Sequence, residues 1–182
     1  NTLKEKIREW KNILLIHREK RVRPGLDDKI LAGWNGLMLK GIVDAYKVFG
    51  EQKFLEFAEE NANFLMSKMT SLEGFLWRTY KNGVAKIQAY LEDYASVIEG
   101  FLALYQVSFN SKYYQFAKKL IEYTINHFYD ETEEMFFYTD ANSEELIARK
   151  KEIFDNVIPS SNSIMAQNLY FAGILFDNQK YK

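Results

Sequence analysis

The sequence has no cysteine, and only two histidines and two prolines occur among its 182 residues. Without cysteine the chain has no disulfide, no thiolate nucleophile and no cysteine metal ligand. The two histidines, His17 and His127, are far apart in the sequence, so a zinc site is not predicted, and we expect no metal and no cofactor. The absence of cysteine is typical of a reducing compartment, and we therefore expect a cytoplasmic protein.

An excess of charge of one sign is also lacking. The 24 basic and 25 acidic residues leave a net charge of −1. This balance gives no electrostatic reason to expect nucleic acid or an anionic membrane as a partner. No apolar run reaches the roughly 18 residues of a membrane-spanning helix, and no signal-peptide pattern is present. The chain starts without methionine, so we expect residues 1–182 to be a single fragment of a longer protein.

Hydrophobic residues make up 47% of the chain, which is enough for a real core, and the scarcity of proline favours long helices. Apolar residues at helical spacing predict six helices. The second helix is expected to start at a cap formed by Asp27 or Asp28 and to end at Gly50, and the sixth to carry Pro159 in its first turn. The predicted helices cover residues 2–20, 28–49, 51–69, 92–109 and 112–129, and a stretch that begins near 159–160.

Two short hairpins are expected between the helices. The first lies within residues 76–90 around Asn82-Gly83, a strong turn signal. The second would pair residues 136–139 with residues 146–149. The chain also repeats itself, because the stretch from Gly41 aligns with the stretch from Gly100, 59 residues later. A repeat of about 60 residues built from helix pairs predicts an all-α fold of stacked helical hairpins, either open or closed into a toroid, with apolar inner helices and amphipathic outer ones.

Polar residues gather at the start of each predicted inner helix. If the inner helices are parallel, three such clusters share one face of the domain, and carboxylates placed there are suited to acid–base chemistry. The acidic candidates for catalysis are Asp28, Glu92, Asp93 and Asp155, and the candidates for ligand binding are Trp34, Asn35, Tyr94, Ser160, Asn162 and Ser163. Structural roles remain open for all of them. Asp, Asn and Ser are also the preferred helix caps, and Trp34 also suits a core.

Three segments carry a resemblance to a known family. RVRPGLDDKILAGWNGLML, YLEDYASVIEGFLALY and DNVIPSSNSIMAQNL resemble the spermatogenesis-associated protein 20-like family, also described as thioredoxin-domain-containing or DUF255 proteins. The resemblance covers essentially the whole chain. It implies an incomplete (α/α)6 toroid of the six-hairpin glycosidase type, with the N-terminal thioredoxin-like domain and the remaining helices absent. It also implies that the candidates named above, together with Asp27, are motif positions of the family.

Three hypotheses about function follow. The leading one is a carbohydrate-active domain, either glycosidase-like or merely sugar-binding, with Asp28 and Asp93 as acid and base and with Trp34 and Tyr94 stacking on sugar rings. The second is a scaffold for the thioredoxin-like domain of the full-length chain. The third is a sugar 2-epimerase. An incomplete toroid exposes the surface of its inner helices, so we also expect the fragment to self-associate.

Overall fold

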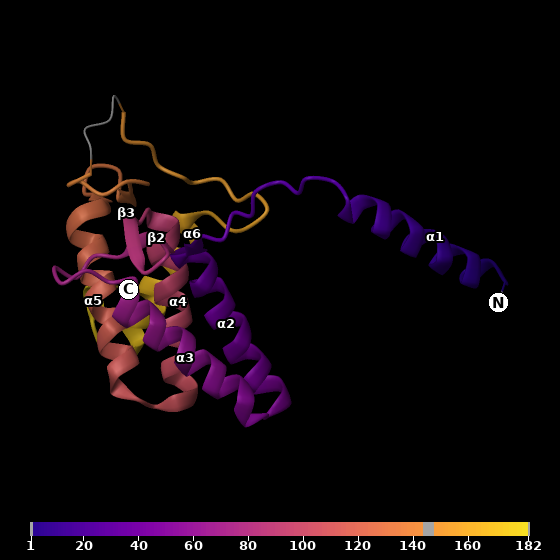
Figure 1. Ribbon diagram of the computed structural model, residues 1–182. Helices are drawn as coiled ribbons and strands as arrows, with labels where there is room; N and C mark the ends of the chain where they lie inside the picture. Colours follow the sequence, from indigo (N-terminus) through magenta and orange to yellow (C-terminus); the bar gives the residue numbers. More distant parts are fainter. Residues whose placement is uncertain (1, 144–147, 182) are drawn as a thin grey trace.

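The computed structural model describes residues 2–143 and 148–181 (Figure 1). Within these residues the chain forms six α-helices, all close to the predicted ranges. The helices are α1 (Thr2–Glu19), α2 (Ala32–Phe49), α3 (Gln52–Lys68), α4 (Leu91–Ser108), α5 (Ser111–Phe128) and α6 (Ser161–Leu175), followed by a 3-10 turn η1 (Gln179–Tyr181). The strands are β1 (Ile30–Leu31), β2 (Trp77–Lys81), β3 (Val84–Gln88), β4 (Tyr129–Asp130) and β5 (Met135–Phe136).

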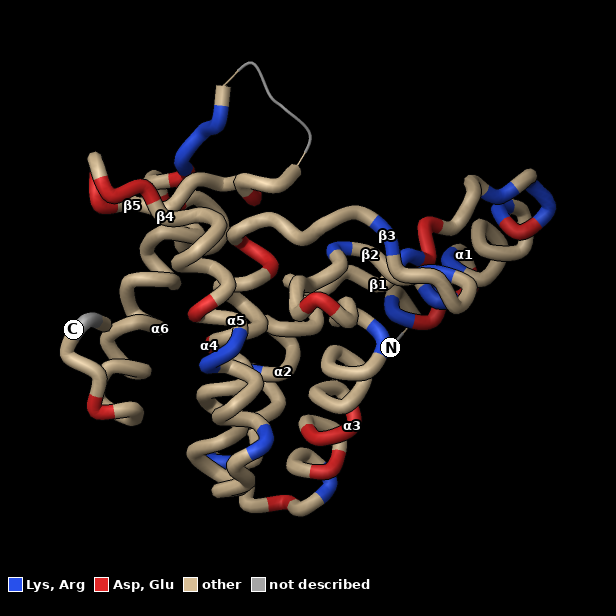
Figure 2. The backbone as a smooth tube through the Cα atoms, turned by 90° about the vertical axis from the view of Figure 1, so that its left-hand side faces the viewer, with Lys and Arg blue, Asp and Glu red and all other residues tan. Residues whose placement is uncertain are grey.

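The first helix stands apart from the rest of the molecule. Figure 1 shows α1 projecting from the body at the end of an extended segment, and none of its residues is buried. Its apolar stripe is therefore exposed, including Leu3, Trp10 and Leu14. Lys and Arg outnumber Asp and Glu on α1 and on the loop that follows it (Figure 2).

Helices α2 and α4 pack in parallel at close range, and glycine permits the approach. A Cβ atom at Gly36 would lie 2.6 Å from the backbone of Ser96 and Val97, and one at Gly100 would lie 2.9 Å from the carbonyl oxygen of Gly36. Gly33, one turn earlier, faces Asp93 at the start of α4. Contacts therefore advance in the same direction along both helices, which makes them parallel. Gly41, by contrast, has nothing within 4 Å of its Cβ position and takes no part in this close packing.

Helix α6 is the third parallel member of this inner layer. The side-chain amide of Asn168 donates a 2.8 Å hydrogen bond to the carbonyl oxygen of Ala95 on α4. At its far end Phe176 packs on Tyr114, which in turn packs on Tyr105 in the last turn of α4. The amino ends of α2, α4 and α6 therefore lie at one end of the molecule, as the sequence predicts. We call this end the amino face.

Helices α3 and α5 form the outer layer. Phe101 of the inner helix α4 packs on Phe116 and Tyr113 of α5, with ring centroids 4.5 and 6.0 Å apart. The two outer helices meet where Tyr113 donates a hydrogen bond to Glu59. The pairs α2/α3 and α4/α5 are thus successive helical hairpins. α4, which has neighbours on both sides, contributes most of its residues to the core.

The start of α2 differs from the prediction. Neither Asp27 nor Asp28 caps this helix, because Ile30 and Leu31 first pair with β2 as the edge of a three-stranded antiparallel sheet. The helix therefore begins at Ala32, and its N-cap residue, Leu31, has no side-chain hydrogen bond to offer. At its other end Gly50 adopts φ 67° and closes the helix, as predicted.

The first predicted hairpin is confirmed, since β2 and β3 pair antiparallel around Asn82-Gly83. The second was wrong, because β5 pairs with β4, directly after α5. Part of its predicted second arm, at residues 146 and 147, lies outside the described residues. Pro159 precedes the N-cap Ser160 and so lies outside α6 rather than in its first turn. None of the described helices is both long and apolar enough to cross a membrane.

Candidate functional site

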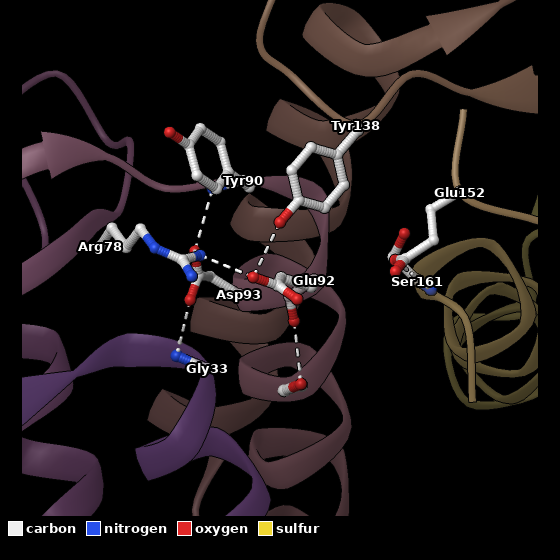
Figure 3. Close-up of polar contacts among 9 residues, drawn as sticks. Gly33, Arg78, Tyr90, Glu92, Asp93, Tyr138, Glu152 and Ser161 are labelled. Atoms are coloured by element: carbon white, nitrogen blue, oxygen red, sulfur yellow. Dashed lines mark hydrogen bonds and ion pairs between the residues drawn. The ribbon is translucent and has the colours of Figure 1, made fainter. Parts of the chain in front are cut away.

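Two neighbouring acids at the start of α4 have different surroundings. Asp93 is buried, with 2% exposure, and its carboxylate joins the starts of two helices. Oδ1 accepts a 2.9 Å hydrogen bond from the N–H of Gly33 in α2, and Oδ2 accepts one of 3.0 Å from the N–H of Tyr90. Arg78 of β2 donates a third, of 2.7 Å, to Oδ2 (Figure 3). Asp93 therefore serves as a cap for its own helix and for its neighbour.

The charges of Asp93 and Arg78 influence each other's pKa. Burial raises the pKa of the Asp93 carboxyl above its ordinary value, although Arg78 and the N–H groups of Tyr90 and Gly33 favour the charged form. Burial alone would lower the pKa of Arg78, but Asp93 and Glu92 outweigh it and raise that pKa, so the guanidinium stays charged. Arg78 also lies over the ring of Tyr90, 4.7 Å from its centroid.

Glu92 is the more accessible carboxylate of the pair. Its side chain is 30% exposed, and Oε1 accepts hydrogen bonds of 2.7 Å from Arg78 and 2.8 Å from the hydroxyl of Tyr138. Within the described residues, Oε2 accepts no hydrogen bond. Burial, followed by the bond to Glu92, raises the pKa of Tyr138, so its phenol remains a donor. Glu92 is thus held in place through one oxygen, and its side chain is only partly covered.

Aromatic rings adjoin this carboxylate. The rings of Tyr90 and Tyr138 lie 5.0 Å apart at 30° to each other. Figure 3 shows Glu92 beneath the hydroxyl of Tyr138, with Arg78 on one side and with Glu152 and Ser161 on the other. Glu152 accepts a 3.1 Å hydrogen bond from the N–H of Ser161, at the start of α6. The amino face therefore carries two separate glutamates, Glu92 in the first turn of α4 and Glu152 on the loop that leads to α6.

The polar cluster at α6 holds together its own loop. Asp155 accepts hydrogen bonds from the N–H of Ser160 and the hydroxyl of Ser163, which lower the pKa of its carboxyl. Ser160 is the N-cap and accepts from the N–H of Ser163. Asn162 exchanges hydrogen bonds of 2.8 and 3.0 Å with the backbone of Phe136. These four predicted site residues fix the start of α6 beside β5.

The remaining candidates lie elsewhere. Asp28 is on the loop before β1 and pairs with Lys81, and that hydrogen bond lowers the pKa of its carboxyl. Asp93 instead pairs with Arg78. Arg78 and Lys81 lie three residues apart on β2, and because side chains alternate along a strand, they point to opposite faces of the sheet. The structure therefore does not bring Asp28 and Asp93 together as an acid–base pair.

Two of the proposed ligand contacts belong to a groove between α2 and α3. Trp34, 73% exposed, and Asn35 line this groove together with Phe57 and Asn61. Asn35 also donates to the carbonyl oxygen of Leu31.

Tyr94 is 1% exposed and stacks on Tyr123 with centroids 5.5 Å apart, and its hydroxyl accepts from the N–H of Leu76. Its ring has no face open to a ligand, and we assign it to the core.

Sequence reasoning missed Tyr138 and Glu152. Tyr138 reaches Glu92 from a segment 46 positions further along the chain. Nothing in the local pattern around either residue marks it, because each is placed by tertiary contacts. The described residues contain no group of three or more His, Asp or Glu side chains arranged to hold a metal ion.

The chain is similar to known proteins over most of its length. It is 34% identical over 162 residues to human spermatogenesis-associated protein 20, a match that covers 84% of this chain and 21% of that protein. The chain is a homologue of spermatogenesis-associated protein 20. An uncharacterized protein of Caenorhabditis elegans is 30% identical over 188 residues, covering 99% of this chain and 25% of the relative. The chain thus spans only about a fifth to a quarter of these relatives, and no protein-family model matches it.

Solved structures of sugar enzymes share the fold. A glycoside hydrolase family 76 α-mannanase of Bacteroides thetaiotaomicron has a TM-score of 0.68 and 16% identity, covering 87% of this chain and 43% of the enzyme. Cellobiose 2-epimerase of Bacillus thermoamylovorans has a TM-score of 0.70 and 13% identity, covering 84% and 41%. The prediction of a six-hairpin glycosidase-like (α/α)6 toroid, present here in part, is confirmed.

Proposed function

We propose that this chain is part of a carbohydrate-active domain, and that its amino face binds a saccharide with Glu92 as the carboxylate that meets the ligand. The observation that carries the proposal is the position of Glu92. It is the acid that Arg78 and Tyr138 hold at the start of an inner helix, with one oxygen that no described residue bonds. The fold is shared with a mannanase and a sugar epimerase, which supports carbohydrate as the ligand class by analogy of fold.

The proposal gives the predicted site residues different roles. Asp93 becomes a positioning residue, because all its hydrogen bonds go to Gly33, Tyr90 and Arg78, and through Arg78 it orients Glu92. Glycoside hydrolysis requires a second carboxylate. Glu152, across the amino face from Glu92, is the candidate for that group (Figure 3). The predicted catalytic role of Asp28 is not part of the proposal.

A specific observation also favours the scaffold hypothesis. Asp93, Asp155 and Asn162 all bind backbone groups, as structural clamps do. In this alternative the amino face supports another part of the full-length protein, such as the thioredoxin-like domain implied by the family resemblance. The epimerase hypothesis has less support, because we expect such an enzyme to use histidines on its inner helices, and neither histidine of this chain lies on one. His17 lies on α1 and His127 lies on α5.

Binding to a saccharide array distinguishes these alternatives. The panel contains mannan-derived and cellulose-derived oligosaccharides, and the proteins are the wild-type chain, Glu92→Gln and the control Glu56→Gln on the exposed side of α3. We expect wild type and Glu56→Gln to bind at least one oligosaccharide, and Glu92→Gln to bind it at least about tenfold more weakly, since a charge-assisted hydrogen bond is lost. Equal binding by all three proteins, or no binding by wild type, would contradict the proposal.

A further inference from the structure

A second feature of the inner layer lies further along the helices than the amino face. A cavity of about 210 Å³ lies among α2, α4 and α6. This volume is below the roughly 300–1,000 Å³ of pockets for larger ligands, so it suits a molecule of one ring. Its lining residues are Lys40 and Lys47 of α2, Glu99, Leu102, Ala103 and Gln106 of α4, and Gln167, Asn168 and Phe171 of α6.

The cavity lies on the same face of α4 as Glu92. Glu99 is seven residues after Glu92, which is two turns and about 10 Å along the helix. The opposite face of α4 packs on α5 through Phe101. The cavity therefore opens on the inner side of the curved helix layer, and one line along α4 connects it with the amino face.

Glu99 has no hydrogen-bonding partner to explain its position. Among the described residues its carboxylate makes no hydrogen bond and no ion pair, although it is partly buried. Burial raises the pKa of Glu99 against the opposing effect of Lys40. The amides of Gln106 and Gln167, on exposed side chains at the rim of the cavity, make no hydrogen bond within the described part of the chain. The half-buried carboxylate of Glu99 and the exposed amides of Gln106 and Gln167 therefore line one small space in which a ligand could bond all three.

The charges around the cavity indicate a ligand without net charge. Lys40 and Lys47 both pair with Asp44, at 2.5 and 3.8 Å. With Glu99 included, two cationic side chains face two anionic ones, so neither an anion nor a cation is favoured. Phe171, 42% exposed, adds an aromatic face to the lining.

We propose that this cavity binds one neutral saccharide ring, with Glu99, Gln106 and Gln167 bonding its hydroxyls and Phe171 packing on its apolar face. The inference rests on the proposed function and adds a subsite to it. A carboxylate accepts hydrogen bonds from the hydroxyls at the edge of a sugar ring, and an amide both accepts and donates there. An aromatic side chain instead packs on the C–H face of the ring. The residues come from two helices, so binding also joins α4 to α6.

Isothermal titration of the wild-type chain with D-mannose, a single neutral ring, tests the inference. Glu99→Gln and Gln167→Ala are the cavity variants, and Glu122→Gln on the outer helix α5 is the matched control. We expect D-mannose to bind wild type and Glu122→Gln alike, and both cavity variants to bind it at least about tenfold more weakly. D-glucuronate and D-glucosamine, which carry opposite charges, should bind wild type more weakly than D-mannose.

The variant Glu92→Gln separates this inference from the proposed function. If mannose binding falls in the cavity variants but not in Glu92→Gln, the cavity is a saccharide subsite of its own. If it falls in Glu92→Gln and is unchanged in both cavity variants, the inference is overturned and the proposed function stands. Absence of mannose binding to wild type overturns the inference, while the oligosaccharide array still decides the proposed function. Should Glu99→Gln fold poorly, Gln167→Ala alone gives the decision.

Discussion

At the scale of single residues, Asp93 and Glu92 are adjacent in sequence but have opposite surroundings. Asp93 is buried and bonded to two helix starts, whereas Glu92 is partly exposed, with one oxygen that no described residue bonds. One of two adjacent acids is enough to cap a helix, and the structure gives the capping role to Asp93. Which acid is the clamp could not be predicted, because the second helix that Asp93 caps lies 60 positions away in the chain.

Removing the clamp should destabilise the protein. Asp93→Ala leaves the N–H groups of Gly33 and Tyr90 without their acceptor and leaves Arg78 with Glu92 alone. Each unsatisfied buried donor costs about 1–3 kcal/mol, so we expect the free energy of unfolding to fall by about 2–5 kcal/mol in urea denaturation. The control Asp27→Ala removes an exposed acid and should change it by less than about 0.5 kcal/mol. Equal effects of the two substitutions would refute the clamp.

The partly buried Glu99 carboxylate should make stability depend on pH. Burial raises its pKa above the ordinary value of 4.5, so the folded state binds this proton more tightly than the unfolded state. Its contribution to stability is therefore fully present below pH 4.5 and is lost as the pH rises through the folded-state pKa. Glu99→Gln removes this loss.

The measurement is the melting temperature of wild type and Glu99→Gln at several pH values. We expect the variant to gain relative to wild type as the pH increases from 4 to 7. The same substitution is expected to weaken sugar binding, so a gain in stability together with a loss of affinity would identify Glu99 as a functional group. A difference in melting temperature that stays constant with pH would count against the raised pKa.

At the scale of elements, the helices could be predicted well and the start of α2 could not. Apolar periodicity predicts each helix to within a few residues, because amphipathic burial is a local pattern. Asp27 and Asp28 resemble caps, but pairing of Ile30 and Leu31 with β2 takes the following residues into a strand. Strand pairing is a long-range contact that overrides this local signal. The same reason accounts for the second hairpin, in which β5 pairs with β4 instead of with the later segment.

The contact between α2 and α4 gives a paired prediction at this scale. Gly36→Ala places a methyl group against the backbone of Ser96 and Val97 and should lower the free energy of unfolding by about 1–3 kcal/mol. Gly41→Ala lies in the same helix with open space around the new methyl group, and should raise it by about 0.5–1 kcal/mol. Chemical denaturation of both variants is the measurement. Stabilisation by both alanines would show that the two helices are not in close contact at Gly36.

At the scale of the whole molecule, the parallel inner helices could be inferred from the repeat, because equivalent units stack in the same direction. The position of α1 could not be inferred, since its apolar stripe predicts a packed helix and the structure leaves it exposed. Exposed apolar residues occur both on α1, at Leu3, Trp10 and Leu14, and on α2, at Trp34 and Met38.

These surfaces should drive association of the chain in solution. Large exposed apolar patches favour burial against a partner. We expect light scattering to give a dimer or larger species at micromolar concentration, and Trp10→Lys to shift it toward the monomer. The control Glu9→Lys, at the residue directly before Trp10, changes the charge of α1 without removing apolar area. A clean monomer of the wild-type chain would contradict this prediction.

The central claim is that a saccharide binds where α2, α4 and α6 begin together, at Glu92. Hydrogen–deuterium exchange measured with and without the oligosaccharide that binds best on the array tests it most directly. The account predicts slower exchange in the segments around Glu92, Tyr138 and Glu152, with little change on the outer helices α3 and α5. Protection confined to α3, α5 or the groove at Trp34 would contradict it.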